Sequence, residues 1–151
     1  MILIPELKQY VKDTEQALED VNFARVVVVK DELTTFLSKI RPTDNQIMIA
    51  VMPDASTRGN DVDKLKLRNS LGFFFLEKTD YGATRQDDWL DVFSRTQETA
   101  LAFFNKVLDD SIDGPCGFIR DLVVSNISIN PESNLVGCNG WSVELYFDST
   151  V

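Results

Sequence analysis

The chain of 151 residues contains no histidine. Histidine is the commonest general base in enzymes and the commonest metal ligand among side chains. Its absence excludes Ser-His-Asp and Cys-His nucleophile systems. No glycine pattern with Walker-type or dinucleotide-binding spacing occurs either, so no phosphate cradle is recognisable. We therefore predict no catalytic residue, no metal site and no cofactor.

Cysteine is scarce and long apolar runs are absent. The two cysteines, Cys116 and Cys138, form neither a CxxC pair nor part of a zinc-binding pattern. We expect two reduced, partly buried thiols, with Cys138 in a hairpin loop. No apolar run approaches the roughly 18 residues that a membrane-spanning helix needs, and the first residues include no basic leader. The sequence predicts a soluble protein, made in a cytoplasm, without membrane contact.

Basic residues are few for a nucleic-acid-binding protein. Fifteen Lys and Arg stand against 24 Asp and Glu, which gives a net charge of −9. Because duplex DNA is bound mainly through neutralisation of its phosphates, a chain of this charge is poorly suited to hold it. The densest basic segment is 64–68, with Arg58 nearby, and it lies among Asp61 and Asp63. We interpret it as a solvated strand or loop face.

The sequence does contain a clear alternation of helical and strand patterns. Apolar residues at helical spacing predict helices, and β-branched or fully apolar runs predict strands. The expected elements in chain order are a helix over 3–20, a strand over 23–29, a helix over 31–39, strands over 46–52 and 71–79, a long helix over 87–109, and a hairpin of 122–129 with 141–148. The polar segments 53–61 and 80–88 are expected loops. Segment 62–70 is expected to extend the 71–79 strand outward as a hairpin arm.

This order of elements predicts a single α+β domain over 1–151. We expect an antiparallel or mixed sheet of four to five strands, with the N-terminal helix and the long helix packed on one face. The predicted buried stripe of the long helix consists of Trp89, Phe93, Thr96, Ala100, Phe103 and Val107, widened by Leu90, Leu101, Phe104 and Leu108. Side chains alternate along a strand, so one or two rings of the run 73–75 should pack on the long helix and one on the opposite face.

The segment NGWSVELYFD, residues 139–148, has the clearest strand pattern. Asn139-Gly140 predicts a turn, and strict alternation follows it. The two alternating sets are an apolar one, Trp141, Val143, Leu145 and Phe147, and a polar one, Ser142, Glu144, Tyr146 and Asp148. We expect the apolar set to face the core, with Trp141 as an anchor. The polar set is then available to solvent or to a neighbouring subunit.

Two acidic segments have some of the features of chemical sites. The stretch 54–65 partly matches the spacing of a calcium-binding loop, but Arg58 and Leu65 occupy ligand positions. Asp80, Asp87 and Asp88 gather before the long helix, where acids more often complement the helix dipole than act as an acid–base pair. A plain acidic loop and a helix start are the better interpretations.

Taken whole, residues 2–148 resemble the tail terminator and tail completion proteins of tailed bacteriophages. The resemblance is carried by the leading helix, the run QIMIAVM before a long polar loop, LGFFFLEKTDYG before a long helix, and the closing NISINPESNLVGCNGWSVELYFDS. It implies a structural virion protein without catalytic residues. It implies a ring, commonly a homohexamer, that caps the tail tube and joins it to the head at the neck.

The resemblance also implies partners and a location. The partners would be copies of the same chain, the tail tube and neck or connector proteins, while DNA passes through without being specifically bound. The protein would be assembled in the host cytoplasm and reside in the tail–neck region of the virion. We expect contacts from the 53–62 and 79–87 loops and the C-terminal hairpin. The candidate interface residues are Asp54, Arg58, Asp61, Asp80, Tyr81, Arg85, Glu144 and Tyr146.

Two rival hypotheses remain open at this level. The first is a small acidic binding module, such as an immunity or adaptor protein, which would be a monomer or dimer with one foreign partner. The second is an enzyme that uses Asp and Lys alone. Alanine at Asp54, Asp80 or Asp87 would then abolish its activity.

Overall fold

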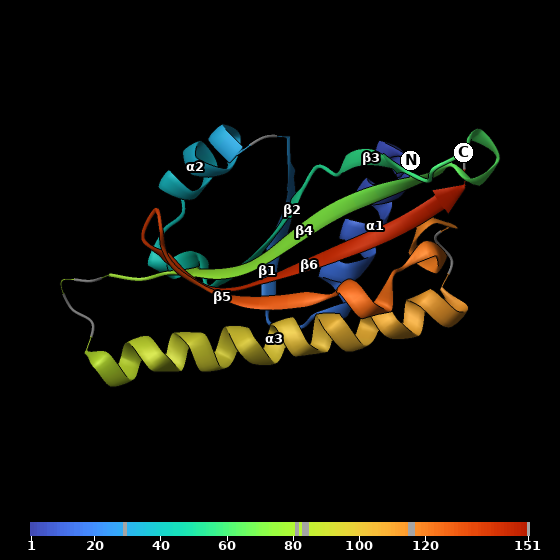
Figure 1. The fold of residues 1–151 in the computed structure, drawn as a ribbon. Coiled ribbons are helices and arrows are strands. Elements are labelled where there is room, and N and C mark those ends of the chain that lie inside the picture. Colours follow the sequence, from blue (N-terminus) through green and yellow to red (C-terminus); the bar gives the residue numbers. More distant parts are fainter. Residues whose placement is uncertain (29, 81, 83–84, 115–116, 151) are drawn as a thin grey trace.

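The fold is taken from a computed structural model that describes residues 1–28, 30–80, 82, 85–114 and 117–150. Its elements in chain order are α1 (Ile4–Ala17), β1 (Val21–Val27), α2 (Lys30–Ser38), β2 (Gln46–Val51), β3 (Asp54–Arg58), β4 (Lys66–Lys78), α3 (Gln86–Asp113), β5 (Ser128–Leu135) and β6 (Cys138–Thr150) (Figure 1). The α+β class is confirmed. Within these residues the sheet has six strands, not four to five.

The sheet is mixed and is built around two long antiparallel strands. Its order is β1-β2-β4-β6-β5, and only the β1–β2 pair is parallel among the described strands. β6 covers one edge of β4 along its whole length, from Lys78↔Cys138 to Lys66↔Thr150. The other edge of β4 is shared, because β2 pairs with its second half and β3 with its first half. The sheet therefore continues past β2 as a narrower extension.

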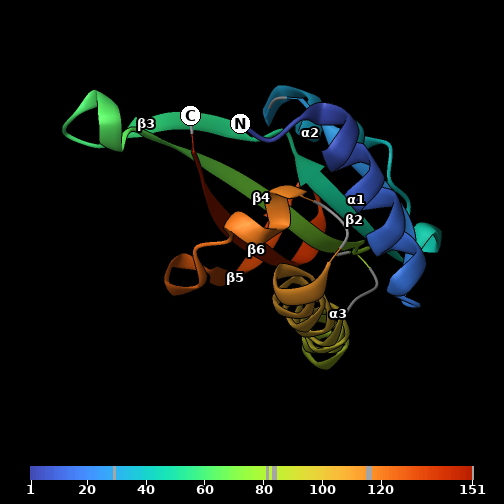
Figure 2. The same cartoon turned by 90° about the vertical axis from the view of Figure 1, so that its right-hand side faces the viewer.

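We call this extension the arm, formed by β3, the first half of β4 and the end of β6 (residues 54–70 and 146–150). It projects beyond the rest of the molecule in both views (Figures 1 and 2). All five residues of β3 are exposed. The N-terminus is attached near the base of the arm, where the Ile2 amide donates to Asn69 Oδ1 at 3.1 Å and the Met1 amine donates to Ser149 Oγ at 3.1 Å.

The main core lies between the sheet and the helices α1 and α3, as predicted for the N-terminal and long helices. Phe103 of α3 packs against Phe73 and Phe75 of β4, with ring centroids 4.5 and 5.1 Å apart. Its other fully or nearly buried members include Leu7, Tyr10, Val11, Met48, Ala50, Leu71, Ala100, Val107, Ile119, Val143, Leu145 and Phe147. The predicted apolar face of the 141–148 strand is confirmed. Trp141 is partly buried, and its Nε1 donates to the Phe93 carbonyl at 2.9 Å.

A second, smaller core lies on the opposite face of the sheet, under α2 (Figure 1). Leu33 and Leu37 of α2 pack there with Ile47 and Ile49 of β2, and Phe74 packs against this cluster. The predicted division of the 73–75 rings between the two faces is confirmed. The residues of this second core come from α2, β1, β2 and the neighbouring ends of β4, β5 and β6. α2 therefore covers only this part of the face.

The prediction of a loop over 53–61 is wrong for Asp54–Arg58, which forms β3. This strand is exposed and polar, so it has no alternating apolar pattern. Its pairing is determined by the protruding half of β4, from Asp54↔Ser70 to Arg58↔Lys66. The expected extension of the 71–79 strand as a hairpin arm is confirmed. A calcium-binding loop over 54–65 is not compatible with this strand.

The predicted turn at Asn139-Gly140 is also wrong. The hairpin turns at Val136 and Gly137, whose φ angles are 53° and 74°. A two-residue turn with both φ angles positive matches the twist of an antiparallel pair. Asn139 instead lies within β6, where its Oδ1 accepts from the Asn134 amide at 2.8 Å and its Nδ2 donates to Thr79 Oγ1 at 2.9 Å. The side-chain amide of Asn139 therefore stabilises the register shift of the β5–β6 ladder between Glu132 and Leu135.

Three further expectations need correction. Cys138 lies in β6, not in a loop; it is a free, buried thiol, and burial raises its pKa to about 11. Cys116 lies outside the described residues. The strand expected over 122–129 begins only at Ser128, as β5, and Val124–Asn126 before it forms a short 3₁₀ turn. Leu90 and Leu101 do not widen the buried stripe of α3, since they are 51% and 47% exposed.

Candidate functional site

An open groove lies on the sheet face that α2 leaves partly uncovered. Its volume is about 530 Å³, and β4 and β6 contribute residues from the middle of the sheet. Gly72 of β4 has no side chain, and a Cβ atom there would have as its nearest neighbour only the Phe74 ring, at 3.9 Å. The apolar residues that line the groove are Leu33, Val51, Met52, Phe74, Leu135 and Val143. The groove is therefore large enough to admit side chains of another molecule.

Three carboxylates lie along this groove: Asp54 of β3, Glu132 of β5 and Glu144 of β6. Glu132 accepts a hydrogen bond from Ser142 Oγ at 2.7 Å, and Glu144 accepts one from the Tyr146 hydroxyl at 2.9 Å. The hydrogen bond to Glu144 raises the pKa of Tyr146, because the carboxylate favours the protonated phenol. Among the ion pairs of the described residues, none involves these three carboxylates. The residues that line the groove thus include three acidic and no basic side chains.

The base of the arm is held by a two-point ion pair across β4 and β6. Arg68 Nε and Nη2 donate to the two carboxylate oxygens of Asp148, each at 2.6 Å. These hydrogen bonds are the main reason that the pKa of Asp148 is lowered, and the charges of Arg58 and Lys66 act in the same direction. Both oxygens of Asp148 are thus already hydrogen-bonded within the chain.

Arg68→Met is expected to raise the pKa of Asp148 toward the ordinary value of a carboxyl group. Because the pKa of Asp148 is lower in the folded chain than in the unfolded chain, the ion pair stabilises the fold at any pH above the ordinary carboxyl pKa. This contribution is lost as the pH falls below the ordinary pKa and through the lowered pKa of the folded chain. Carbon NMR of the Asp148 carboxylate during a pH titration measures the shift. Arg58→Met is the matched control and should move the pKa less, since Arg58 acts only through its charge. An equal shift in both variants would contradict the described pairing.

The tip of the arm is the contrasting surface. Arg58 and Lys66 stand directly opposite each other in the β3–β4 ladder, an arrangement of like charges that destabilises a sheet. Val62, in the turn between the two strands, is 88% exposed, and Lys64 beside it is exposed as well. The turn needs Gly59, whose φ is 134° and where a Cβ atom would lie 2.6 Å from the Lys64 carbonyl oxygen. The tip therefore presents the cations Arg58, Lys64 and Lys66 near the exposed Val62, whose own chain neighbours are the exposed Asp61 and Asp63.

The structure divides the predicted interface residues into two groups. Asp54, Arg58, Glu144 and Tyr146 belong to the same outer face of the sheet, by their positions in the β3–β4–β6 ladders. Asp61 immediately precedes the 3₁₀ turn at the tip of the arm. These residues, from three separate segments, therefore form one continuous region of the surface.

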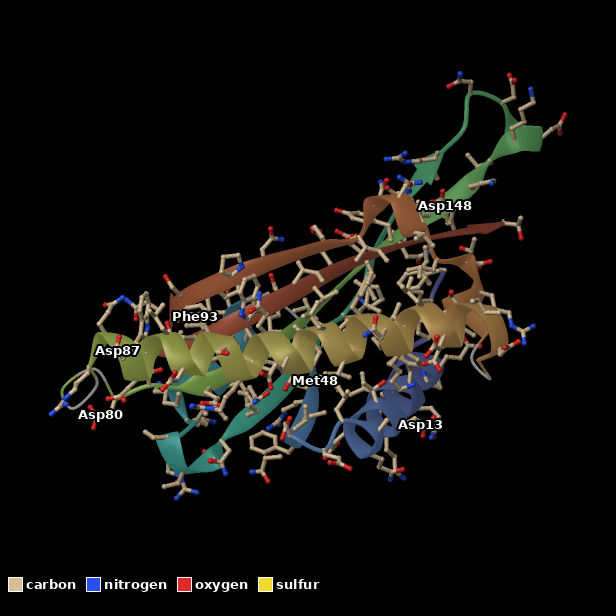
Figure 3. The ribbon with its side chains drawn as sticks, turned by 90° about the horizontal axis from the view of Figure 1, so that it is seen from below. Asp13, Met48, Asp80, Asp87, Phe93 and Asp148 are labelled. Atoms are coloured by element: carbon tan, nitrogen blue, oxygen red, sulfur yellow. The ribbon has the colours of Figure 1, made fainter. Side chains whose placement is uncertain are left out.

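The second group lies elsewhere. Asp80 and Arg85 belong to the connection between β4 and α3, at the other end of the molecule from the arm; Figure 3 shows Asp80 and Asp87 at this end and Asp148 toward the arm. Asp80 Oδ1 accepts from the Gly82 amide at 3.1 Å, and Tyr81 lies outside the described residues. Asp54 and the pair Asp80 and Asp87 are therefore not brought together as one acid–base site.

Three relevant residues escape the sequence reasoning: Glu132, Gly72 and Val62. Glu132 falls in an expected loop, and only the true hairpin register places it opposite Gly140, on the same face as Glu144. The period-2 alternation of 66–74 could identify Gly72 as a neighbour of the polar face. Val62 has no periodic signal, because it lies in a turn.

Comparisons of the chain with protein-family models, with curated protein sequences and with solved structures find no match. Among the described residues, no group of three or more acidic or cysteine side chains is arranged to hold a metal ion. In the same part of the chain, no helix is both long and apolar enough to cross a bilayer.

Proposed function

We propose that this chain is a structural protein of a tailed-bacteriophage virion that assembles with copies of itself into a ring at the tail–neck junction. Its role is that of a tail terminator or tail completion protein, without enzymatic activity. The observation that carries the proposal is the arm, a strand extension in which all five residues of β3 are exposed. Strand extensions of this kind with unpaired edges are suited to contacts with another chain.

Two further features support the proposal. The net charge of −9 allows DNA to pass through a ring lumen without adhering to its wall. The arm and the N-terminal end of α3 lie at opposite ends of the molecule, so one subunit can contact two neighbours through different patches (Figures 1 and 3). When two different patches of the same chain bind each other, each copy adds the next one with the same rotation. The assembly closes into a ring when a whole number of these rotations completes a circle. The remaining partners are the tail tube and the neck proteins.

Native mass is the first test of this function. Six subunits of 17.1 kDa have a mass of about 103 kDa, and light scattering together with negative-stain imaging should show a ring of that mass with a central hole. Purified tail tubes serve as a second sample, since some ring subunits assemble only on their support. A monomer that also fails to bind tail tubes would contradict the proposal.

The acidic groove supports one alternative, a small binding module that accepts a basic segment of a foreign protein. Such a module would be a monomer or dimer on its own and would bind one partner in a fixed ratio. Self-association therefore distinguishes the two functions.

A further inference from the structure

We infer that the tip of the arm of one copy occupies the acidic groove of a second copy. This inference rests on the proposed self-assembly and specifies the contact through which it occurs. The receiving surface combines an apolar lining with Asp54, Glu132 and Glu144, none of which has a cationic partner in the described ion pairs. Carboxylates in a partly apolar groove are stabilised when a cation enters.

The arm tip has the complementary chemistry. It carries Arg58, Lys64 and Lys66 against Asp61 and Asp63, three cations against two carboxylates, in a chain whose total charge is −9. Asp148 compensates Arg58 and Lys66 only through its charge, since both of its oxygens are bonded to Arg68. An acidic groove relieves the repulsion between these two opposed cations, and its apolar lining can cover the exposed Val62.

A subunit's own arm cannot fill its own groove. Asp54 and Ser70, a paired position at the base of the arm, line the groove, and the strands run from there toward the tip. Lys66 lies four residues further along β4, roughly 13 Å away at about 3.3 Å per residue. Folding the tip back would break the Lys66↔Thr150 end of the central ladder. The occupant must therefore come from another copy, and each copy supplies one arm and one groove.

Charge reversal tests the contact directly. Variant A is Arg58→Glu/Lys66→Glu, and variant B is Glu132→Lys/Glu144→Lys. Each variant alone should self-associate at least about tenfold more weakly than the wild type in sedimentation velocity at low ionic strength, because like charges then face each other. An equimolar mixture should assemble again, since the arm of A fits the groove of B and the arm of B fits the groove of A.

Matched controls reverse single charges on α1 and α3, which cover the opposite face of the sheet. Lys12→Glu and Glu98→Lys are both at exposed positions and should leave self-association unchanged. Circular dichroism verifies that every variant is folded. Wild-type-like association of A and B, or a mixture that stays dissociated, would overturn the inference.

A second variant tests the groove without any change of charge. Gly72→Val fills the groove, and the chain itself should tolerate it, because the nearest atom to the new Cβ lies at 3.9 Å and β-branched residues suit strands. The folded variant should lose self-association to a similar extent. If Gly72→Val and variants A and B all form rings as stable as those of the wild type, the arm-in-groove contact is wrong. The proposed function would still hold in that case. A wild type that never self-associates, even on tail tubes, would overturn both.

Discussion

Gly140→Ala is expected to lower the free energy of unfolding by on the order of 3–5 kcal/mol, although it adds a single methyl group. Gly140 has a φ of 156°, and a Cβ atom there would lie 2.0 Å from the Phe75 carbonyl oxygen. The neighbouring atom belongs to the backbone of the central strand, so it cannot move aside without disturbing the β4–β6 ladder. Such a loss is a large part of the 5–15 kcal/mol that stabilises an ordinary domain.

Urea denaturation followed by circular dichroism measures this loss, with the slope of the transition as a check on two-state behaviour. Gly72→Ala is the matched control in the neighbouring strand, where the nearest atom to the new Cβ lies at 3.9 Å. Because it only restricts the unfolded chain, it should be neutral or stabilise by up to about 1 kcal/mol. Equal effects of the two substitutions would show that β4 does not approach Gly140 closely.

Phe103→Ala is the second large effect that we expect, at about 3–5 kcal/mol. The ring is fully buried between Phe73 and Phe75, so its removal loses both apolar burial and two ring contacts and leaves a cavity. α3 would lose its principal attachment to the middle of the sheet. The midpoint of denaturation should fall while the slope stays the same.

Leu101→Ala, two positions earlier on the same helix, is the control for Phe103→Ala. Leu101 is 47% exposed, and alanine is a better helix former, so the change should stay within about 0.5 kcal/mol. Thermal melts provide an independent measurement, in which each kcal/mol corresponds to roughly 2–4 °C for a chain of this size. A comparable loss in both variants would mean that α3 packs in a different rotational position.

The parts of the fold that the sequence predicts well are those with strong periodicity. The long helix, the buried run 46–52 and the apolar face of 141–148 all have an apolar pattern that matches their burial. β3 lacks such a pattern because both of its faces are exposed, and only its pairing with the arm of β4 makes it a strand. Local composition cannot reveal a pairing between segments that are distant from the core.

The hairpin turn illustrates a different limit. Asn139-Gly140 is the strongest local turn signal of the region, but neither residue forms a turn. Gly140 allows the backbones of β4 and β6 to approach closely, and the Asn139 side chain makes hydrogen bonds to Asn134 and Thr79. The actual turn uses Val136, a β-branched residue that rarely adopts a positive φ. The resulting register determines which residues of β5 reach the groove, so the error in the turn also hides Glu132 from the candidate site.

The spatial grouping of the candidate interface residues is not evident from the sequence for the same reason. Asp54, Arg58, Glu144 and Tyr146 share one face because β3, β4 and β6 pair side by side, whereas Asp80 and Arg85 lie at the far end. Polar character alone identifies exposed loops. It does not specify which of them share a face.

The central β4–β6 ladder has a consequence for how the chain folds during synthesis. Its pairs join residues that are far apart in sequence, and loop closure of this length makes folding slow. β6 lies between β4 and β5 in the sheet. Until the ribosome has released residues 138–150, the aromatic run of β4 and the whole of β5 therefore lack their pairing partner. A nascent chain at that stage exposes an unpaired apolar edge, the type of surface on which chains aggregate. The yield of folded protein thus depends on how quickly β6 reaches the gap that the earlier strands leave open.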